Sequence, residues 1–226
     1  MLSRGGKLPV RQIKKFIEAS YDVKNINRFK KFTIEEYELD LELSNKWGRI
    51  FYNKKLNKLV IVHRGTASNR DWFNNATIAI DVYELTDRFK TAKILQTKAE
   101  LKYPGSKVYT LGHSQSGQLT HKLGTNSSNV ISLNPAYKLE NQRNNEFVIR
   151  SSIDPVSVLK SPHNKAMEVM YPGWNRKHNI TIQATTNNLL TEHSPAILDR
   201  LNGDMMIGRG KLKTFKFKNI TYKITI

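Results

Sequence analysis

The chain has 226 residues, enough to bury the core of one domain, and a formal net charge of +18 at pH 7. It contains no cysteine, which excludes disulfide frameworks, thiolate metal sites and cysteine nucleophiles. No window approaches the roughly 18 consecutive apolar residues of a membrane span, and the first residues lack the apolar stretch of a secretory signal. We therefore expect a protein without signal peptide or transmembrane segment, located in the cytoplasm of the producing cell.

The positive charge is concentrated at the two ends of the chain. Residues 1–31 carry nine Lys or Arg and two acids, and residues 205–226 carry six Lys or Arg and no acid, which leaves a charge of only +5 for the residues between. A charged terminus attracts polyanions whatever the chemistry of the central domain. We expect a basic N-terminal segment over 1–31, a central domain over 32–204 and a basic C-terminal segment over 205–226.

The N-terminal segment contains a short amphipathic helix over residues 10–21. Its apolar residues recur at three- and four-residue steps, with basic residues between them. Two interpretations remain open. The helix either packs on the domain and leaves its basic face in water, or contacts an anionic membrane surface.

The central domain begins with strand patterns. Residues 37–45 alternate between apolar and polar, and residues 47–65 predict two strands joined by a polar turn at 54–57. The second of these, KLVIVH, is an almost unbroken apolar run, as expected for an interior strand covered on both faces. A helix over 87–103 follows and stops at Pro104 and Gly105.

In the remainder of the domain, segments with the alternating pattern of a strand take turns with segments that have the 3.6-residue period of a helix. A strand over 107–112, a helix over 115–124 and a strand over 129–135 follow one another, and further strands are expected at 146–152 and 178–185. A helix over 194–201 begins with Ser194 as N-cap and Pro195 at its first position. This alternation predicts an α/β fold with a mainly parallel sheet and helices on both faces.

Residues 110–119, TLGHSQSGQL, place Ser114 between a strand and a helix. This is the layout of a nucleophile elbow, in which a sharp turn lifts an exposed hydroxyl above the carboxyl edge of a sheet. Strand and helix approach closely there, so small residues are needed two positions before and after the serine. Gly112 satisfies the first position, whereas Ser116 takes the second, where glycine is usual. On this pattern alone, Ser114 is either a nucleophile or a small residue in a turn.

Four segments together resemble the class 3 lipases, the α/β-hydrolase family of triacylglycerol lipases. LVIVHRGTASNRDWFNN and VYTLGHSQSG resemble the oxyanion strand-turn and the Gly-His-Ser-Leu-Gly-Gly elbow of that family. VISLNPA looks like the strand that follows the elbow helix, and SSIDPVS is similar to the Asp-Pro-Val acid loop. The resemblance runs from about residue 37 to about residue 200, in the family's order, and implies an α/β-hydrolase domain over 32–204.

The chain also departs from the family pattern. Gln115 replaces an apolar residue, Ser116 replaces glycine, and the spacing from elbow to acid to histidine is short. These departures indicate a compact member, similar to lipase-like proteins of large DNA viruses and their satellites. For such a member, association with a virion is the alternative to a cytoplasmic location.

A serine hydroxyl needs a base to take its proton and an acid to orient the base, and α/β-hydrolases supply them in the order serine, acid, histidine. Of the acids after Ser114, only Asp154 follows a strand in a proline-containing turn, and it also matches the family's acid. Of the later histidines, His193 lies in a loop between the last strand and a helix, where the family places its base. His178 opens a strand, and His163 lies in KSPHNK. The expected triad is Ser114, Asp154 and His193.

An oxyanion hole needs two donors aimed at the tetrahedral intermediate. The backbone N–H of Gln115 is one, and by the family match Thr66 is the other. The resemblance also gives His113 and Arg64 structural roles beside the elbow and the turn. The apolar residues between Thr66 and Leu85 form either a cover over the site that contacts an acyl chain, or part of the core.

These features predict a serine carboxylic-ester hydrolase, a lipase or phospholipase that acts on lipid acyl esters through an acyl-enzyme intermediate, without metal or cofactor. The alternatives are an esterase or thioesterase for soluble acyl groups, and an inactive lipase-like domain that binds an anionic membrane or nucleic acid through its basic termini. Residues 205–226 alternate as a β-hairpin that turns near residues 218–219 and packs on the domain. Its lysines protect a sheet edge, hold the domain at an anionic bilayer or contact nucleic acid.

Overall fold

A computed structural model describes residues 6–22, 31–65, 86–136, 142–155 and 178–208, together with the backbone of 216–217 and 220–221. Some of the expected features fall elsewhere. Thr66, the apolar segment that runs on to Leu85, and His163 lie outside the described residues.

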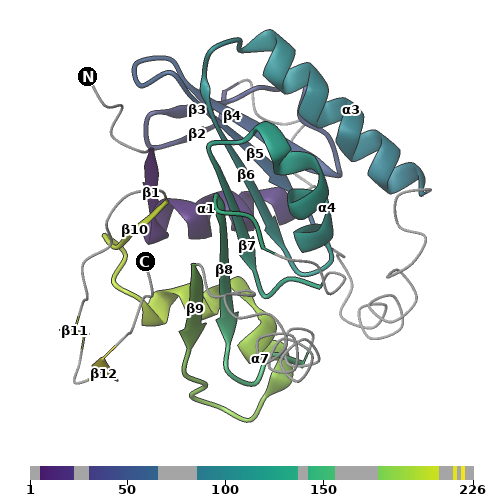
Figure 1. Cartoon of the computed structure of the whole chain (residues 1–226). Helices are drawn as coiled ribbons and strands as arrows, with labels where there is room; N and C mark the ends of the chain where they lie inside the picture. Colours follow the sequence, from purple (N-terminus) through teal and green to yellow (C-terminus); the bar gives the residue numbers. More distant parts are fainter. Residues whose placement is uncertain are drawn as a thin grey trace.

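Among the described residues, an eight-stranded sheet forms the centre of the molecule (Figure 1), in the order β2-β3-β4-β5-β6-β7-β8-β9. Neighbours from β2 to β5 run antiparallel, and neighbours from β5 to β9 run parallel. The carboxyl ends of β5 to β9 therefore meet along one edge, where α/β sheets bind their ligands. The bounds are β2 Thr33–Ile34, β3 Tyr37–Leu39, β4 Gly48–Asn53, β5 Lys58–His63, β6 Lys107–His113, β7 Asn129–Leu133, β8 Glu146–Ser151 and β9 Asn179–Ile182.

Helices cover both faces of this sheet, as the sequence predicts (Figure 1). Successive strand residues point to opposite faces. Accordingly Ile61 of β5 belongs to the cluster that includes Leu95 of α3 (Asp87–Lys102), whereas Val62 belongs to the cluster that includes Phe16 of α1 (Val10–Tyr21). On the face of α3 lies α4 (Ser116–Leu123), and on the face of α1 lies the 3-10 helix η4 (Pro195–Arg200).

Helix α1 is part of the domain, which confirms the packed interpretation of residues 10–21. Its apolar side chains are buried, and its first free N–H groups, those of residues 10 and 11, donate to carbonyl oxygens of residues 205 and 203. Its basic residues lie against acids of the same chain. Lys14 contacts Asp199 at 2.6 Å, Lys15 lies 3.5 Å from Glu35, and Arg11 pairs with Asp204.

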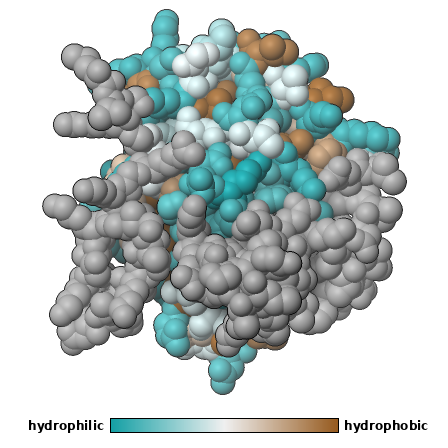
Figure 2. All heavy atoms as spheres, viewed as in Figure 1, coloured by the Kyte–Doolittle hydropathy of each residue, from teal (hydrophilic) through white to brown (hydrophobic). Residues whose placement is uncertain are grey.

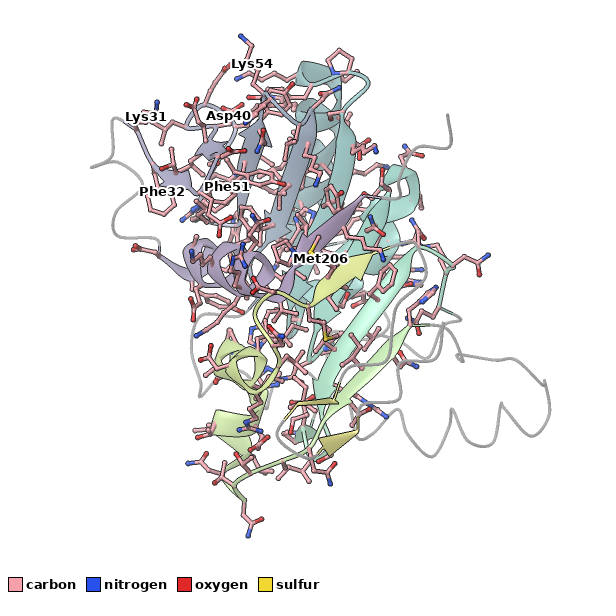
Figure 3. All side chains as sticks on the ribbon, turned by 90° about the vertical axis from the view of Figure 1, so that its left-hand side faces the viewer. Lys31, Phe32, Asp40, Phe51, Lys54 and Met206 are labelled. Carbon is pink, nitrogen blue, oxygen red and sulfur yellow. The ribbon has the colours of Figure 1, made fainter. Side chains whose placement is uncertain are left out.

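The N-terminal strand β1 (Lys7–Pro9) pairs antiparallel with β10 (Met206–Gly208), near the other end of the chain. Figure 3, which labels Met206, shows β10 beside β1. This pairing joins the expected N-terminal segment, 1–31, to the expected C-terminal segment, 205–226. Further on, β11 (Lys216–Phe217) pairs antiparallel with β12 (Ile220–Thr221), within the segment where the sequence predicts a hairpin.

Three expectations about elements were wrong in detail. The strand expected over 37–45 ends at Leu39, because the side chain of Asp40 accepts hydrogen bonds from the backbone N–H groups of residues 42 and 43 and forms a turn. The helix expected over 194–201 is the 3-10 helix η4, although Ser194 caps it as predicted. His193 ends a short helix, α7 (Leu189–His193), instead of lying in a loop.

Figure 2 shows the surface in the same view as Figure 1. Among the described residues, hydrophobic side chains form small separate groups on this face. Those exposed on α3 include Ile94 and Leu101. None of the described helices combines the length and apolar character that crossing a bilayer requires.

Candidate active site

Ser114 follows β6 directly and occupies a strained turn. Its φ of 59° lies in the left-handed region, which costs a residue with a side chain about 1–3 kcal/mol. Its N–H donates to the carbonyl of Leu133 at 3.0 Å, and its own carbonyl accepts from Gly117 at 2.9 Å and Ala136 at 3.0 Å. The predicted strand–serine–helix layout is therefore confirmed. The expected exposure of the hydroxyl is wrong, since Ser114 is only 2% exposed.

Neighbouring atoms leave no room for a larger residue at Gly112, just before the turn. A Cβ on Gly112 would lie 2.6 Å from a methyl of Thr120 and 2.8 Å from the carbonyl oxygen of Ser116. Ser116 itself is fully buried, and its hydroxyl accepts from the N–H of His113 at 2.8 Å and donates to the carbonyl of His113 at 2.9 Å. The hydroxyl at this position therefore ties the start of α4 to the end of β6.

The end of β5 reaches the same point through Gly65. A Cβ on this residue would lie 3.4 Å from the Cβ of Ser114 and 2.5 Å from the carbonyl oxygen of His113. The backbone just before Thr66 therefore lies against the elbow, and any larger residue at position 65 would displace it. Gln115, the other expected oxyanion residue, is half-buried directly before α4.

Asp154 and His193 meet beside this elbow. Nδ1 of His193 lies 2.5 Å from Oδ1 of Asp154, with Asp154 fully buried and His193 8% exposed. A carboxylate only accepts, so the proton of this bond sits on Nδ1 and leaves Nε2 as an acceptor. The other described histidine considered as a base, His178, lies directly before β9, and its ring is tilted against that of Phe147 at a centroid distance of 4.5 Å.

The side chain of His113 holds the backbone of His193 in place. Its Nε2–H donates to the backbone carbonyl of His193 at 2.7 Å, and its Nδ1 accepts from the hydroxyl of Tyr21 at 2.7 Å. The two imidazole rings are 4.9 Å apart. Burial lowers the pKa of His113 to about 3, which keeps the ring neutral and preserves this pattern of one donor and one acceptor.

Asn134 links three elements at the carboxyl edge. It follows β7 with a φ of 43°, a conformation that asparagine tolerates. Its Nδ2 donates to the carbonyls of Glu192 at 3.0 Å and His193 at 2.9 Å, while its Oδ1 accepts from the N–H of Ser151 at 3.0 Å. A single buried amide therefore sets the position of α7 relative to β7 and β8.

The side chain of Glu192 completes this support. It is fully buried, pairs with Arg200 at 2.6 and 2.8 Å, and accepts from the hydroxyl of Ser151 at 2.5 Å. Two N–H groups of the segment before α7 also donate to it, at 3.1 and 3.2 Å. Hydrogen bonds from Arg200 above all, and from Ser151, lower the pKa of Glu192 to about 2.

We expect Glu192→Gln to lower the free energy of unfolding by about 2–3 kcal/mol at pH 7, because it removes the charge partner of Arg200, whose side chain is 20% exposed, and weakens the charged hydrogen bonds between them. Folding lowers the pKa of Glu192. Its contribution to the free energy of unfolding of the wild type is therefore fully present above the ordinary glutamate pKa of 4.5 and is lost as pH falls towards 2. Urea titrations of both proteins from pH 7 to pH 3 measure this difference.

Glu38→Gln is the matched control for that titration. Glu38 pairs with Lys31 at 3.0 Å on the surface, where its side chain is 64% exposed. Removing a surface pair should cost less than about 1 kcal/mol at any pH. Equal losses in the two variants, or a Glu192→Gln difference that does not change with pH, would contradict the assigned role.

Lipase structures resemble this fold. The chain superposes on the Lip2 lipase from Yarrowia lipolytica with a TM-score of 0.53 and 14% identity, over 89% of this chain and 83% of that one. A triacylglycerol lipase from Penicillium expansum gives a TM-score of 0.46 and 17% identity, over 78% of each chain. No family model and no curated protein matches the sequence.

The likeness to Lip2 establishes the fold, which is that of an α/β-hydrolase, with the mainly parallel sheet expected for it. These similar structures come from fungi and give no support to a viral placement.

Sequence reasoning selected Ser114, Asp154 and His193, and the structure brings the last two into contact beside the first. Sequence reasoning missed the residues that hold this part of the molecule in place, which are Tyr21, Asn134, Glu192 and Arg200. Asn134 stands at the end of an apolar strand and before a proline, which is a recognisable signal for a special turn. Glu192 and Arg200 are eight residues apart in a polar stretch, and no periodicity marks them as a buried pair.

Proposed function

We propose that the protein is a serine carboxylic-ester hydrolase acting on lipid acyl esters, with Ser114 as nucleophile, His193 as base and Asp154 as orienting acid. The observation that carries the proposal is the 2.5 Å hydrogen bond between His193 and the buried Asp154, beside a serine held at a φ of 59°. Asp154 and His193, far apart in sequence, form the pairing of acid and base that acyl transfer requires, and their order after Ser114 in the chain is the one expected for it.

In the proposed reaction, Oγ of Ser114 attacks the ester carbonyl carbon while Nε2 of His193 takes its proton. The tetrahedral intermediate collapses to an acyl-serine, and the leaving alcohol receives that proton. Water then attacks the acyl-serine with His193 again as base, releasing the carboxylic acid. Asp154 stabilises the imidazolium formed in each half and keeps Nδ1 protonated.

The oxyanion of each tetrahedral intermediate needs donors already in place. We assign the backbone N–H of Gln115 to this role because it follows the nucleophile, and Thr66 because it follows Gly65, which lies against the Cβ of Ser114. The lipid character of the substrate draws support from the fold shared with Lip2, which is described as a lipase.

Reaction with a fluorophosphonate probe tests the proposal. An activated serine attacks the phosphorus and is labelled, whereas a domain that only binds membranes or nucleic acid is not. We expect labelling of one residue, Ser114, located by peptide mass spectrometry, and loss of labelling in Ser114→Ala. A panel of p-nitrophenyl esters from acetate to palmitate then distinguishes a lipase from a soluble-ester esterase. Absence of labelling in folded wild-type protein would reject the hydrolase.

A further inference from the structure

Two arginines lie beside the candidate site, around the ring of Trp47. The guanidinium of Arg64 is 5.5 Å from the ring centroid and that of Arg88 is 5.3 Å from it. Arg88 also donates to the side chain of Gln115 at 2.5 Å and to the backbone carbonyl of Arg64. The pair therefore joins the end of β5, the start of α3 and the residue that follows Ser114.

These cations lack anionic partners in the part of the chain that the structure describes. No carboxylate there forms an ion pair with Arg64 or Arg88, and the nearest acid in sequence, Asp87, lies 3.9 Å from Lys90 instead. Nε of Arg64 and Nε of Arg88 are both buried without a hydrogen-bond partner.

A third arginine increases the local positive charge. Arg49 is almost fully buried, and its guanidinium donates to backbone carbonyls, including that of Asp22 at 2.9 Å. Burial first, and then the charge of Arg64, lower the pKa of Arg49 to about 10. Desolvation and the charge of Arg88 likewise lower the pKa of Arg64. Like charges held together out of water are costly unless an anion compensates them.

The cluster is connected to the elbow through two neighbouring residues. Arg64 directly precedes Gly65, whose backbone contacts the elbow, and Arg88 holds the side chain of the residue after Ser114. Arg64 is 8% exposed, whereas Arg88 and Trp47 are half-buried, so the group opens to the surface at α3.

We propose that Arg64 and Arg88 bind the phosphate of a glycerophospholipid, and that the enzyme cleaves the acyl esters of phospholipids in preference to those of neutral glycerides. Guanidinium groups suit this ligand because their planar N–H forks bond phosphate oxygens in pairs. The inference rests on the proposed hydrolase function and specifies its substrate.

Two substrates with the same acyl chains test it. Wild-type protein should hydrolyse dihexanoylphosphatidylglycerol with a higher kcat/KM than dihexanoylglycerol. Arg88→Gln should lower the ratio of these two values by about tenfold or more, the size expected when a charged hydrogen bond is lost. Lys90→Gln removes the same charge from an exposed site on the same helix, and should leave the ratio within about twofold of wild type.

A proportional loss on both substrates would show that the arginines only support the fold, and would overturn the proposal. So would a wild-type preference for the neutral diester. A second measurement does not depend on how the variant folds. Inorganic phosphate should inhibit hydrolysis of dihexanoylglycerol by the wild type competitively and more strongly than chloride at equal ionic strength, and equal effects of the two ions would also count against the site.

Failure of the proposed function has a different signature. If the wild type hydrolyses neither ester, the hydrolase is rejected, and binding of dihexanoylphosphatidylglycerol measured by calorimetry decides the arginine site alone. Binding that weakens about tenfold or more in Arg88→Gln retains the phosphate site, while absence of binding removes it.

Discussion

Ser114→Ala is expected to hydrolyse acyl esters at least about 1,000-fold more slowly than the wild type and to keep its fold. The substitution removes the attacking oxygen, and whatever rate remains comes from binding and from the oxyanion donors. Alanine adopts the left-handed conformation at this position at a cost similar to that of serine, so the elbow should survive. Initial rates on a p-nitrophenyl ester and a thermal unfolding curve measure both properties.

Ser106→Ala serves as the control for this loss. Ser106 precedes β6 at the opposite edge of the sheet, and its hydroxyl donates to the carbonyl of Tyr103 at 2.8 Å. This variant should keep the wild-type rate. A Ser114→Ala protein with wild-type turnover would remove the central assignment.

The second large effect is expected at the other two members of the proposed triad. His193→Ala removes the base, and Asp154→Asn replaces the acceptor of the 2.5 Å hydrogen bond by an amide that also presents an N–H donor. The amide favours the wrong tautomer of His193, with its proton on Nε2 where the serine proton should go. Losses in kcat of about 10³–10⁴-fold are expected for both variants.

His178→Ala and His163→Ala are the comparison variants, since the sequence leaves both histidines downstream of the acid. Both should keep rates close to wild type, because the proposed triad includes neither; the ring of His178 contacts that of Phe147, while His193 bonds Asp154. If His178→Ala were inactive while His193→Ala remained active, the base would have to be reassigned.

Local patterns in the sequence predict most of the strands and helices near the site. KLVIVH and KVYTLG are apolar runs that only a covered strand accommodates, and α3 and α1 end close to where their periodicity ends. The acid and the base were found because chain order and the family resemblance restrict the choice. The contact between Asp154 and His193 depends on the tertiary structure, and no local sequence pattern predicts it.

The residues that hold the site together were not predictable in this way. Tyr21 reaches His113 from a helix that the sequence describes only as amphipathic and basic. Ser116 looked like a departure from the elbow pattern, and only its two hydrogen bonds to His113 show how the hydroxyl fits. The burial of Ser114 also depends on the packing of distant segments, so the expectation of an exposed hydroxyl failed.

The pairing of β1 with β10 sets the order in which the domain can form during synthesis. Lys7 stands opposite Gly208, and Lys14 bonds Asp199 across 185 positions of sequence. Helix α1 can pack early on the strands that follow it, since Phe16 contacts Tyr37 and Phe51, but its contacts with η4 and the pairing of β1 wait until almost the whole domain has been translated. Closing this side of the domain therefore depends on contacts of very long sequence separation, which form late and slow the folding of a chain.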